Sequence, residues 1–398
     1  LARQECPWHG NTMSVLASLR LSRAPAAAFV VLGLHWGAFA AYVPQIKSKI
    51  GASDALFGTL LLGSAIGLMS AMWLAPRVDR WLGARGLALA TAMFSATFLL
   101  LALASGPVSF ALAMVAVGCA SGLADVVMNA RVSELEAQHR RSLMNVNHAM
   151  FSVAYAIIAI SCGVAREWDV SAFSMFAAIG LVVLWLTTLM TQAPAAQPDH
   201  DVGRAASGYP LGPIVLCGVV VLIAFMAEAA VETWSALYIE RSLLGGAAEG
   251  ALGPAMLGAT MAVGRFAGQA LTDMIKETSL LVLAAVLAAG GLVVAALAGQ
   301  PAVAYAGFGI FGLGVSVIAP MGLALVGQLV SPARRTQAIS RVAVIGFSGF
   351  FLAPVAMGVI SEVLGLRVAF LAVALMLSPV PVLAVLLARR HRTSREAV

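Results

Sequence analysis

Long apolar stretches of similar length follow one another along almost the whole chain, separated by short polar segments. A helix needs roughly 20 consecutive apolar residues to cross a bilayer, where its backbone groups can bond only to each other. We therefore predict that each stretch forms one transmembrane helix. The twelve stretches cover residues 24–44, 55–75, 86–105, 107–130, 143–165, 171–190, 212–239, 250–272, 279–299, 301–329, 338–362 and 366–388.

One long polar segment, Thr191 to Tyr209, separates the first six stretches from the last six. Its prolines and charged residues indicate a linker between two half-domains. The predicted organisation is an N-terminal cytoplasmic segment at 1–23, six-helix bundles at 24–190 and 212–388, a cytoplasmic linker at 191–211 and a cytoplasmic tail at 389–398.

The two halves also contain similar short patterns at a common offset. Tyr42 precedes Lys47 near the end of the first stretch, and Tyr238 precedes Arg241 near the end of the seventh, 194 to 196 residues later. Such an internal repeat is typical of transporter folds that are built from duplicated units. The predicted fold class is therefore an all-α membrane protein whose twelve helices form two pseudo-symmetric bundles.

The composition excludes an ordinary soluble protein. Hydrophobic residues make up 61% of the chain and charged residues only 11%, and the mean hydropathy is +0.94; a soluble domain carries roughly 25% charged residues. The sequence has no nucleophile elbow, Walker-type phosphate loop or paired-histidine metal motif, so we do not expect an enzyme. Its four cysteines show no metal-ligand spacing, and neither a metal nor a cofactor is predicted.

The basic residues indicate the topology. If both termini are cytoplasmic, nineteen of the 24 lysines and arginines fall on the cytoplasmic side, in agreement with the positive-inside rule. The net charge of +6 is then explained by topology and contact with anionic lipids, and no nucleic-acid partner is expected. The segment from Leu1 to Thr12 differs from the rest and precedes Met13, which suggests an upstream or alternative start. We expect the first apolar stretch to remain as helix one.

Residues 75–85, Ala-Pro-Arg-Val-Asp-Arg-Trp-Leu-Gly-Ala-Arg, resemble the signature loop between helices two and three of the major facilitator superfamily. Asp125 to Asn129 and residues 143–152 are similar to helices four and five of its fucose/proton symporter branch. Residues 228–238 and 264–268 resemble less characterised relatives in that branch. The resemblance implies a monomeric transporter in a bacterial inner (plasma) membrane, with a small-molecule solute, protons and the lipid bilayer as partners.

Three carboxyl groups inside the spans are candidates for proton coupling. A charge at the centre of a helix costs roughly 2.5–3.5 kcal/mol on insertion scales, so such residues are functional candidates. Asp125 precedes Asn129 by four residues, which places both on one helical face, and Asn129 is a candidate for solute binding. Glu228 and Glu232 have the same spacing, and two neighbouring carboxyls disfavour double ionisation. The alternatives are a helix-bonding role for Asp125 and a solvated rim position for Glu232.

Five further residues are candidates for solute binding. His35 falls near the bilayer midplane in the first span, where an imidazole can bond a solute or share a proton. Asn147 and His148 match the polar cluster of the fucose branch, and Trp234 and Tyr238 can stack on a sugar-like ring. Each also has a structural interpretation, because a histidine or asparagine can pin two helices together and aromatic residues often anchor a span at the membrane interface.

Charged residues at the cytoplasmic helix ends form a predicted gate set that pairs when the inner side is closed. By resemblance, Asp79 would engage the start of helix eleven, with Arg341 as a possible partner. The alternative is that these charges only set the topology. The gate set consists of Asp79, Arg80, Arg265, Asp273 and Arg341.

Glycines recur at four-residue spacing in two spans, at Gly63 and Gly67 and again at Gly118 and Gly122. Small residues on one face let helix backbones approach closely, so these glycines predict packing interfaces.

The favoured hypothesis for function is proton-coupled symport of a small polar solute, such as a sugar or sugar derivative, by alternating access. The first alternative is a proton-coupled antiporter that exports amphipathic compounds or drugs. The second, from another class, is a non-transporting membrane sensor or scaffold.

Overall fold

The computed structural model describes residues 15–192, 211–330 and 334–396, and the regular structure of this part of the chain is entirely helical. The helices of the first half are α1 (Val15–Leu21), α2 (Arg23–Lys49), α3 (Asp54–Leu60), α4 (Leu62–Leu82), the short 3₁₀ helix η1 (Gly83–Arg85), α5 (Gly86–Leu103), α6 (Pro107–His139), α7 (Met144–Glu167) and α8 (Ala172–Thr187). The helices of the second half are α9 (Leu211–Ser242), α10 (Ala247–Met274), α11 (Glu277–Ala296), α12 (Pro301–Leu329), α13 (Arg335–Phe347), α14 (Gly349–Leu377) and α15 (Pro379–Glu396).

Every predicted apolar stretch lies on a helix. By length and composition, nine helical stretches within the described residues can each cross a membrane, and Ala172–Thr187 is a shorter apolar helix. The last of the nine, Gln337–Arg389, contains both of the final predicted spans. Within it, Gly365 has φ 85° and ψ 162°, a conformation that favours glycine and breaks the helix between the two spans.

Some predicted spans differ in detail from the structure. The second span is broken at Leu61, which separates α3 from α4, and the eleventh at Ser348, which separates α13 from α14. The linker predicted at 191–211 lies almost wholly outside the described residues, as does the segment before Met13.

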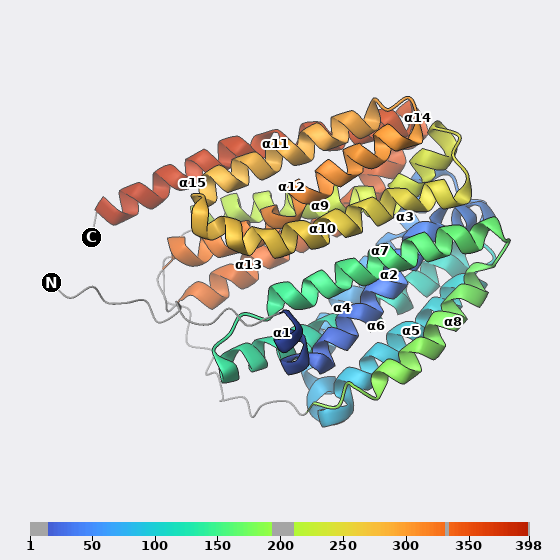
Figure 1. The fold of residues 1–398 in the computed structure, drawn as a ribbon, viewed down its shortest axis with the longest axis horizontal. Helices are drawn as coiled ribbons and strands as arrows, with labels where there is room; N and C mark the ends of the chain where they lie inside the picture. Colours follow the sequence, from blue (N-terminus) through green and yellow to red (C-terminus); the bar gives the residue numbers. More distant parts are fainter. Residues whose placement is uncertain (1–14, 193–210, 331–333, 397–398) are drawn as a thin grey trace.

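The helices form two groups, with the first half below and the second half above in Figure 1. The start of α1 and the end of α15 point toward the same end of the molecule, which we call the proximal end. The opposite end, where α2, α7 and α9 end and α10 begins, is the distal end. Between the halves, α7 packs along α10, α3 packs on α14 and α2 packs on α9.

Glycines allow α4 and α6 to pack closely, as their spacing predicts. A Cβ added at Gly118 would lie 2.6 Å from the carbonyl carbon of Ser64, and one at Gly63 would lie 2.7 Å from the carbonyl oxygen of Ala111. Neither position can hold a side chain without separating the two backbones. The four-residue glycine pattern is therefore a packing signal inside the first half.

Equivalent aromatic contacts occur in both halves. The ring of Tyr42 on α2 meets Phe176 on α8 edge-on at 6.0 Å, and the ring of Tyr238 on α9 meets Phe370 on α14 at 5.3 Å. The two tyrosines are 196 residues apart and the two phenylalanines are 194 residues apart. These separations match the offset of the sequence repeat.

Candidate functional site

Glu228 and Arg265 form an ion pair deep between the halves. Glu228 lies on α9, is 8% exposed, and its Oε1 is 3.4 Å from an Arg265 guanidinium nitrogen on α10. The other terminal nitrogen of Arg265 donates to the His148 carbonyl oxygen at 3.3 Å and to the Ser152 hydroxyl, both on α7 of the first half. We call these four residues the central cluster. Arg265 therefore links a carboxyl group of one half to neutral acceptors of the other.

A second carboxyl group lies one turn from the central cluster. Glu232 follows Glu228 by four residues on α9, and the two carboxyls interact electrostatically. Both carboxyls also interact electrostatically with Tyr155 of α7. The Tyr155 hydroxyl is buried and has no hydrogen-bond partner within the described part of the chain. A proton or a solute hydroxyl placed between α7 and α9 would satisfy these groups.

Asp125 lies in the other half, on α6. The amide of Asn129 donates to its carboxyl oxygen at 3.1 Å and to its backbone carbonyl at 2.8 Å. The predicted shared face is thus present, because residues four apart meet along a helix. Both side chains are half-buried.

Asn147 and His148, at the start of α7, are brought against α2. The Asn147 amide donates to the Ser22 hydroxyl at 3.1 Å and to the Leu143 carbonyl at 2.8 Å. The His148 ring packs edge-on against Phe29 at 4.7 Å. Asn147 therefore pins α7 to α2, while His148 joins the central cluster through its backbone.

His35 is buried inside the first half. Its Nδ1 is 3.0 Å from the Val31 carbonyl and its Nε2 is 3.0 Å from the Ser95 hydroxyl, so both ring nitrogens have partners. The phenyl rings of Phe94 and Phe98 lie 5.3 and 4.8 Å from the imidazole. This environment favours the structural interpretation of His35.

The two aromatic candidates on α9 are fully buried. The Tyr238 hydroxyl donates to the carbonyls of Ala295 and Ala296 at 2.9 and 3.1 Å, which ties α9 to the end of α11. The Trp234 ring meets Phe57 of α3 at 5.9 Å across the two halves, and its indole N–H has no partner among the described residues. Of the two, Trp234 retains a free donor for a solute.

Two of the predicted gate residues, Asp79 and Arg265, have different partners within the described part of the chain. Asp79 pairs at 2.6 Å with Arg131 of α6, a fully buried guanidinium that also bonds Glu134 at 3.2 Å. Arg265 belongs to the central cluster. The other members are Arg80 near the end of α4, Arg341 on α13, and Asp273 near the end of α10, whose side chain lies outside the described part of the structure.

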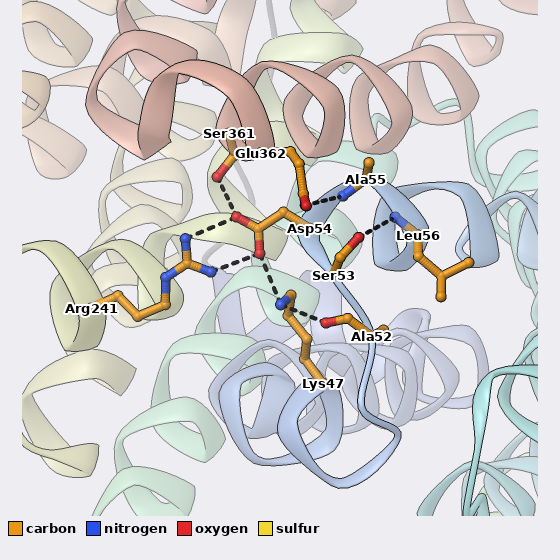
Figure 2. A network of polar contacts seen from close by, with 9 residues as sticks. All are labelled: Lys47, Ala52, Ser53, Asp54, Ala55, Leu56, Arg241, Ser361 and Glu362. Carbon is orange, nitrogen blue, oxygen red and sulfur yellow. Dashed lines mark hydrogen bonds and ion pairs between the residues drawn. The ribbon is translucent and has the colours of Figure 1, made fainter.

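The distal end holds a polar network that the sequence analysis did not select (Figure 2). Asp54 at the start of α3 is 4% exposed. Arg241 of the second half donates to the two carboxyl oxygens of Asp54 at 2.6 and 2.8 Å, and Lys47 of the first half lies 2.8 Å from one of these oxygens. The hydroxyl of Ser361 on α14 donates to the other. These four residues form the distal cluster, in which one carboxylate is shared by a cation from each half.

Close backbone contact accompanies the distal cluster. Glu362 accepts a bond from the Ala55 N–H at 3.1 Å, as Figure 2 shows. A Cβ added at Gly58 on α3 would lie 2.9 Å from the carbonyl carbon of Pro354 on α14, and one at Gly358 would lie 3.2 Å from that of Asp54. The halves are therefore closed against each other at this end.

A second ion pair joins the halves at the same end. Arg166 at the end of α7 binds Glu240 of α9 in a bidentate arrangement, with N–O distances of 2.6 and 3.0 Å. Arg166 also donates to the Ala41 carbonyl of α2 at 2.7 Å. The next residue, Glu167, accepts a bond from the Ala248 N–H of α10 at 2.8 Å.

The sequence contained a signal for these distal residues. Lys47, Arg166 and Arg241 are among the few basic residues that depart from the predicted positive-inside pattern. The positive-inside rule does not explain these three cations. In the structure each of them forms an ion pair, with Asp54 or with Glu240.

The chain was compared with known families and proteins. The sequence profile of the Major Facilitator Superfamily matches residues 26–318 and 285–398. An uncharacterised transporter of this type from Yersinia pestis is 29% identical over 355 residues, which cover 88% of this chain and 91% of the relative. Membrane protein MosC of Rhizobium meliloti is 26% identical over 347 residues, covering 86% and 84%.

Solved structures with similar folds are also transporters. A bacterial homolog of the human lysosomal transporter Spinster, in an inward-facing and occupied conformation, gives a TM-score of 0.75 at 14% identity and covers 95% of this chain and 98% of that one. A D-xylose-proton symporter gives 0.71 at 14% identity, covering 92% and 98%. The fucose:proton symporter of E. coli gives 0.62 at 16% identity, covering 93% and 99%. At these identities the likeness shows the fold alone.

Proposed function

Because this chain belongs to the major facilitator superfamily, a family of multi-pass membrane transporters and not of enzymes, we propose that it couples proton movement to symport of a small polar solute by alternating access. The observation that carries the proposal is the central cluster. Its single guanidinium is shared between the Glu228 carboxyl of one half and the α7 acceptors of the other. The charge of Glu228 is therefore linked to a contact between the halves.

Coupling follows from the charge balance of the cluster. While Glu228 is ionised, it neutralises Arg265 beside α7. A proton on Glu228 removes that counter-charge and leaves the guanidinium bonded to the neutral α7 acceptors, with the Glu232 carboxyl as its remaining nearby negative group; a weakened counter-charge costs more in a dry site than in water. Proton binding then changes the relative free energies of the conformations that make and break the α7–α10 contact. Glu232 and Asp125 are proposed as secondary proton sites.

The solute is proposed to bind between α7, α9 and α6. The candidate groups for a polar solute are the Tyr155 hydroxyl and the Trp234 N–H, which have no partner among the described residues, together with His148. Asn129 would bind the solute through its amide nitrogen only after that nitrogen released its bonds to Asp125. Trp234 also offers an apolar ring face to a sugar-like solute. His35, Asn147 and Tyr238 are assigned to helix packing, because polar atoms of each are already bonded inside its own half.

The remaining proposals concern the setting of the protein. We place it in a bacterial inner membrane with both termini in the cytoplasm, so the distal end faces away from the cytoplasm. The monomer is proposed as the working unit, because the two halves of one chain enclose the central cluster.

One observation favours export of amphipathic compounds as a second candidate. An apolar pocket between α9 and α14 is lined by Met226, Met357 and Met376. Methionine adapts its shape to irregular apolar ligands. Next to it, Phe225 stacks on Phe350 at 4.8 Å. An amphipathic solute that places an apolar ring against these side chains would fit the pocket better than a sugar.

Transport in liposomes tests the proposal. Candidate sugars, polyols, amino acids and amphipathic cations are first screened by thermal shift, since a ligand that binds the folded state stabilises it. With a stabilising solute, wild-type proteoliposomes are expected to alkalinise the solute-containing side as solute and protons leave it together. Acidification of that side would favour the antiporter.

The matched variants for this assay are Glu228→Gln and Asp169→Asn. Glu228→Gln is expected to lose solute-driven proton movement while still exchanging labelled solute, because the amide fills the same space without ionising. Asp169 is an exposed carboxylate at the distal end, and its variant should couple like the wild type. Undiminished proton movement in Glu228→Gln would refute the assignment. Absence of flux for every solute would favour the sensor hypothesis.

A further inference from the structure

Two consecutive residues of opposite charge, Glu240 and Arg241, stand at the distal end of α9. Arg241 pairs with Asp54 on α3, and Glu240 pairs with Arg166 on α7. Adjacent residues on a helix point about 100° apart, so one dipeptide reaches two different helices of the other half. Each pair is close, with N–O distances between 2.6 and 3.0 Å.

The two pairs have opposite polarity. In one, the first half supplies the carboxylate of Asp54; in the other, it supplies the guanidinium of Arg166. If α9 slid so that each side chain met the other partner, Glu240 would face Asp54 and Arg241 would face Arg166. Both contacts would join like charges, so the crossed arrangement permits only one register of the halves.

The first half has its own means of satisfying these charges. Lys47 remains beside Asp54, and the Ala41 carbonyl remains bonded to Arg166. On the second half, the Arg241 side chain is already 46% exposed, and Glu240 lines a hollow at the protein surface together with Lys49 and Gln45. Water can therefore replace both contacts without stranding a buried charge.

We propose that Glu240 and Arg241 act as a two-point latch that closes the distal end of the pathway and sets the register in which it closes. Opening of that end breaks both pairs together, because α3 and α7 belong to one half and α9 to the other. The latch is separate from the central cluster and contacts neither the proton site nor the solute, so it changes their apparent affinities only through the balance of conformations.

Spin-label distances measure the latch directly. Trp168 and Leu244 are 78% and 88% exposed at the distal ends of the two halves. Cysteines at these positions, in a chain whose four native cysteines are replaced, carry spin labels in lipid nanodiscs. Glu240→Gln and Arg241→Gln are each expected to raise the ratio of long to short label distances about tenfold, since a charged hydrogen bond of this kind contributes about that factor. The double variant should raise it further.

A charge exchange separates the latch from simple loss of folding. Arg166→Glu alone places two carboxylates together and should open the distal end, whereas Arg166→Glu with Glu240→Arg restores an attractive pair and should close it again. Asp169→Asn, which removes an exposed charge from the same end, should leave the distances unchanged. Distances in Glu240→Gln and Arg241→Gln that match this control would overturn the proposal, as would failure of the charge exchange to reverse the effect of Arg166→Glu.

Discussion

Substitution of Gly58 by alanine offers a way to weaken the closed distal end through shape alone. The added Cβ would overlap the Pro354 carbonyl, lying 2.9 Å from its carbon and 3.3 Å from the Cα of Gly358. These are backbone atoms of α14, so no side chain can move aside. Relief requires α3 to shift away from α14, which is the direction of opening.

The magnitude follows from the overpacking alone. Overpacking of this kind costs about 1–3 kcal/mol, and it applies only to the closed state because α3 and α14 belong to different halves. The gain of about 0.5–1 kcal/mol from replacing glycine by alanine inside a helix is the same in the open and closed states, so it affects the Tm and not the ratio between them. At about 1.4 kcal/mol for each factor of ten, the penalty shifts the ratio of open to closed molecules about 5–150-fold.

Two matched glycines make the assay decisive. At Gly118, a Cβ would lie 2.6 Å from a backbone atom of Ser64 within the same half, so Gly118→Ala should lower the Tm and leave the distribution of spin-label distances unchanged. Gly290 lies inside α11 and faces open space, so Gly290→Ala should leave the distances unchanged and should raise the Tm slightly through the gain in helix propensity. If Gly58→Ala lowered the Tm as much as Gly118→Ala and left the Trp168–Leu244 label distances unchanged, the assignment of this contact to the closed state would be refuted.

Two further predictions concern side chains with structural roles. Asp79→Asn removes a counter-charge from the fully buried Arg131. It should destabilise the protein by about 3 kcal/mol and lower the Tm more than Glu134→Gln does. Equal Tm values for the two variants would contradict this account. Tyr238→Phe removes a hydroxyl bonded to Ala295 at 2.9 Å. It should lower the free energy of unfolding by about 1 kcal/mol and leave the solute affinity measured by titration calorimetry unchanged. Weaker solute binding would show that Tyr238 belongs to the solute site.

The local packing signals in the sequence were interpretable because each depends on residues close together along the chain. The spacing of Gly63 and Gly67, and of Gly118 and Gly122, places each pair on one helical face, and these faces meet between α4 and α6. The four-residue separation of Asp125 and Asn129 likewise predicts the hydrogen bond that the structure contains. Both follow from the 3.6-residue period of the helix.

Contacts between distant helices could not be predicted in the same way. Asp79 pairs with Arg131 in this structure. The sequence analysis named Arg341 as a possible partner, because no local pattern in the sequence indicates which arginine lies beside Asp79. Arg265 was placed among cytoplasmic charges by its position in the sequence, but α10 carries it deep enough to reach Glu228 and α7. Depth and facing depend on how each helix is tilted and rotated against its neighbours, which the order of residues does not specify.

The sequence by itself therefore determined that the chain is a helical membrane protein of two similar halves, because bilayer thickness fixes the length of each apolar stretch and the unbonded backbone excludes other structures. Only the tertiary structure decided which charges meet. Asp54 and Arg241 are 187 residues apart, and their pairing exists because the two halves close against each other at the distal end. Residues far apart along the chain become partners through helix packing, and which residues meet depends on all the helix interfaces of the fold together.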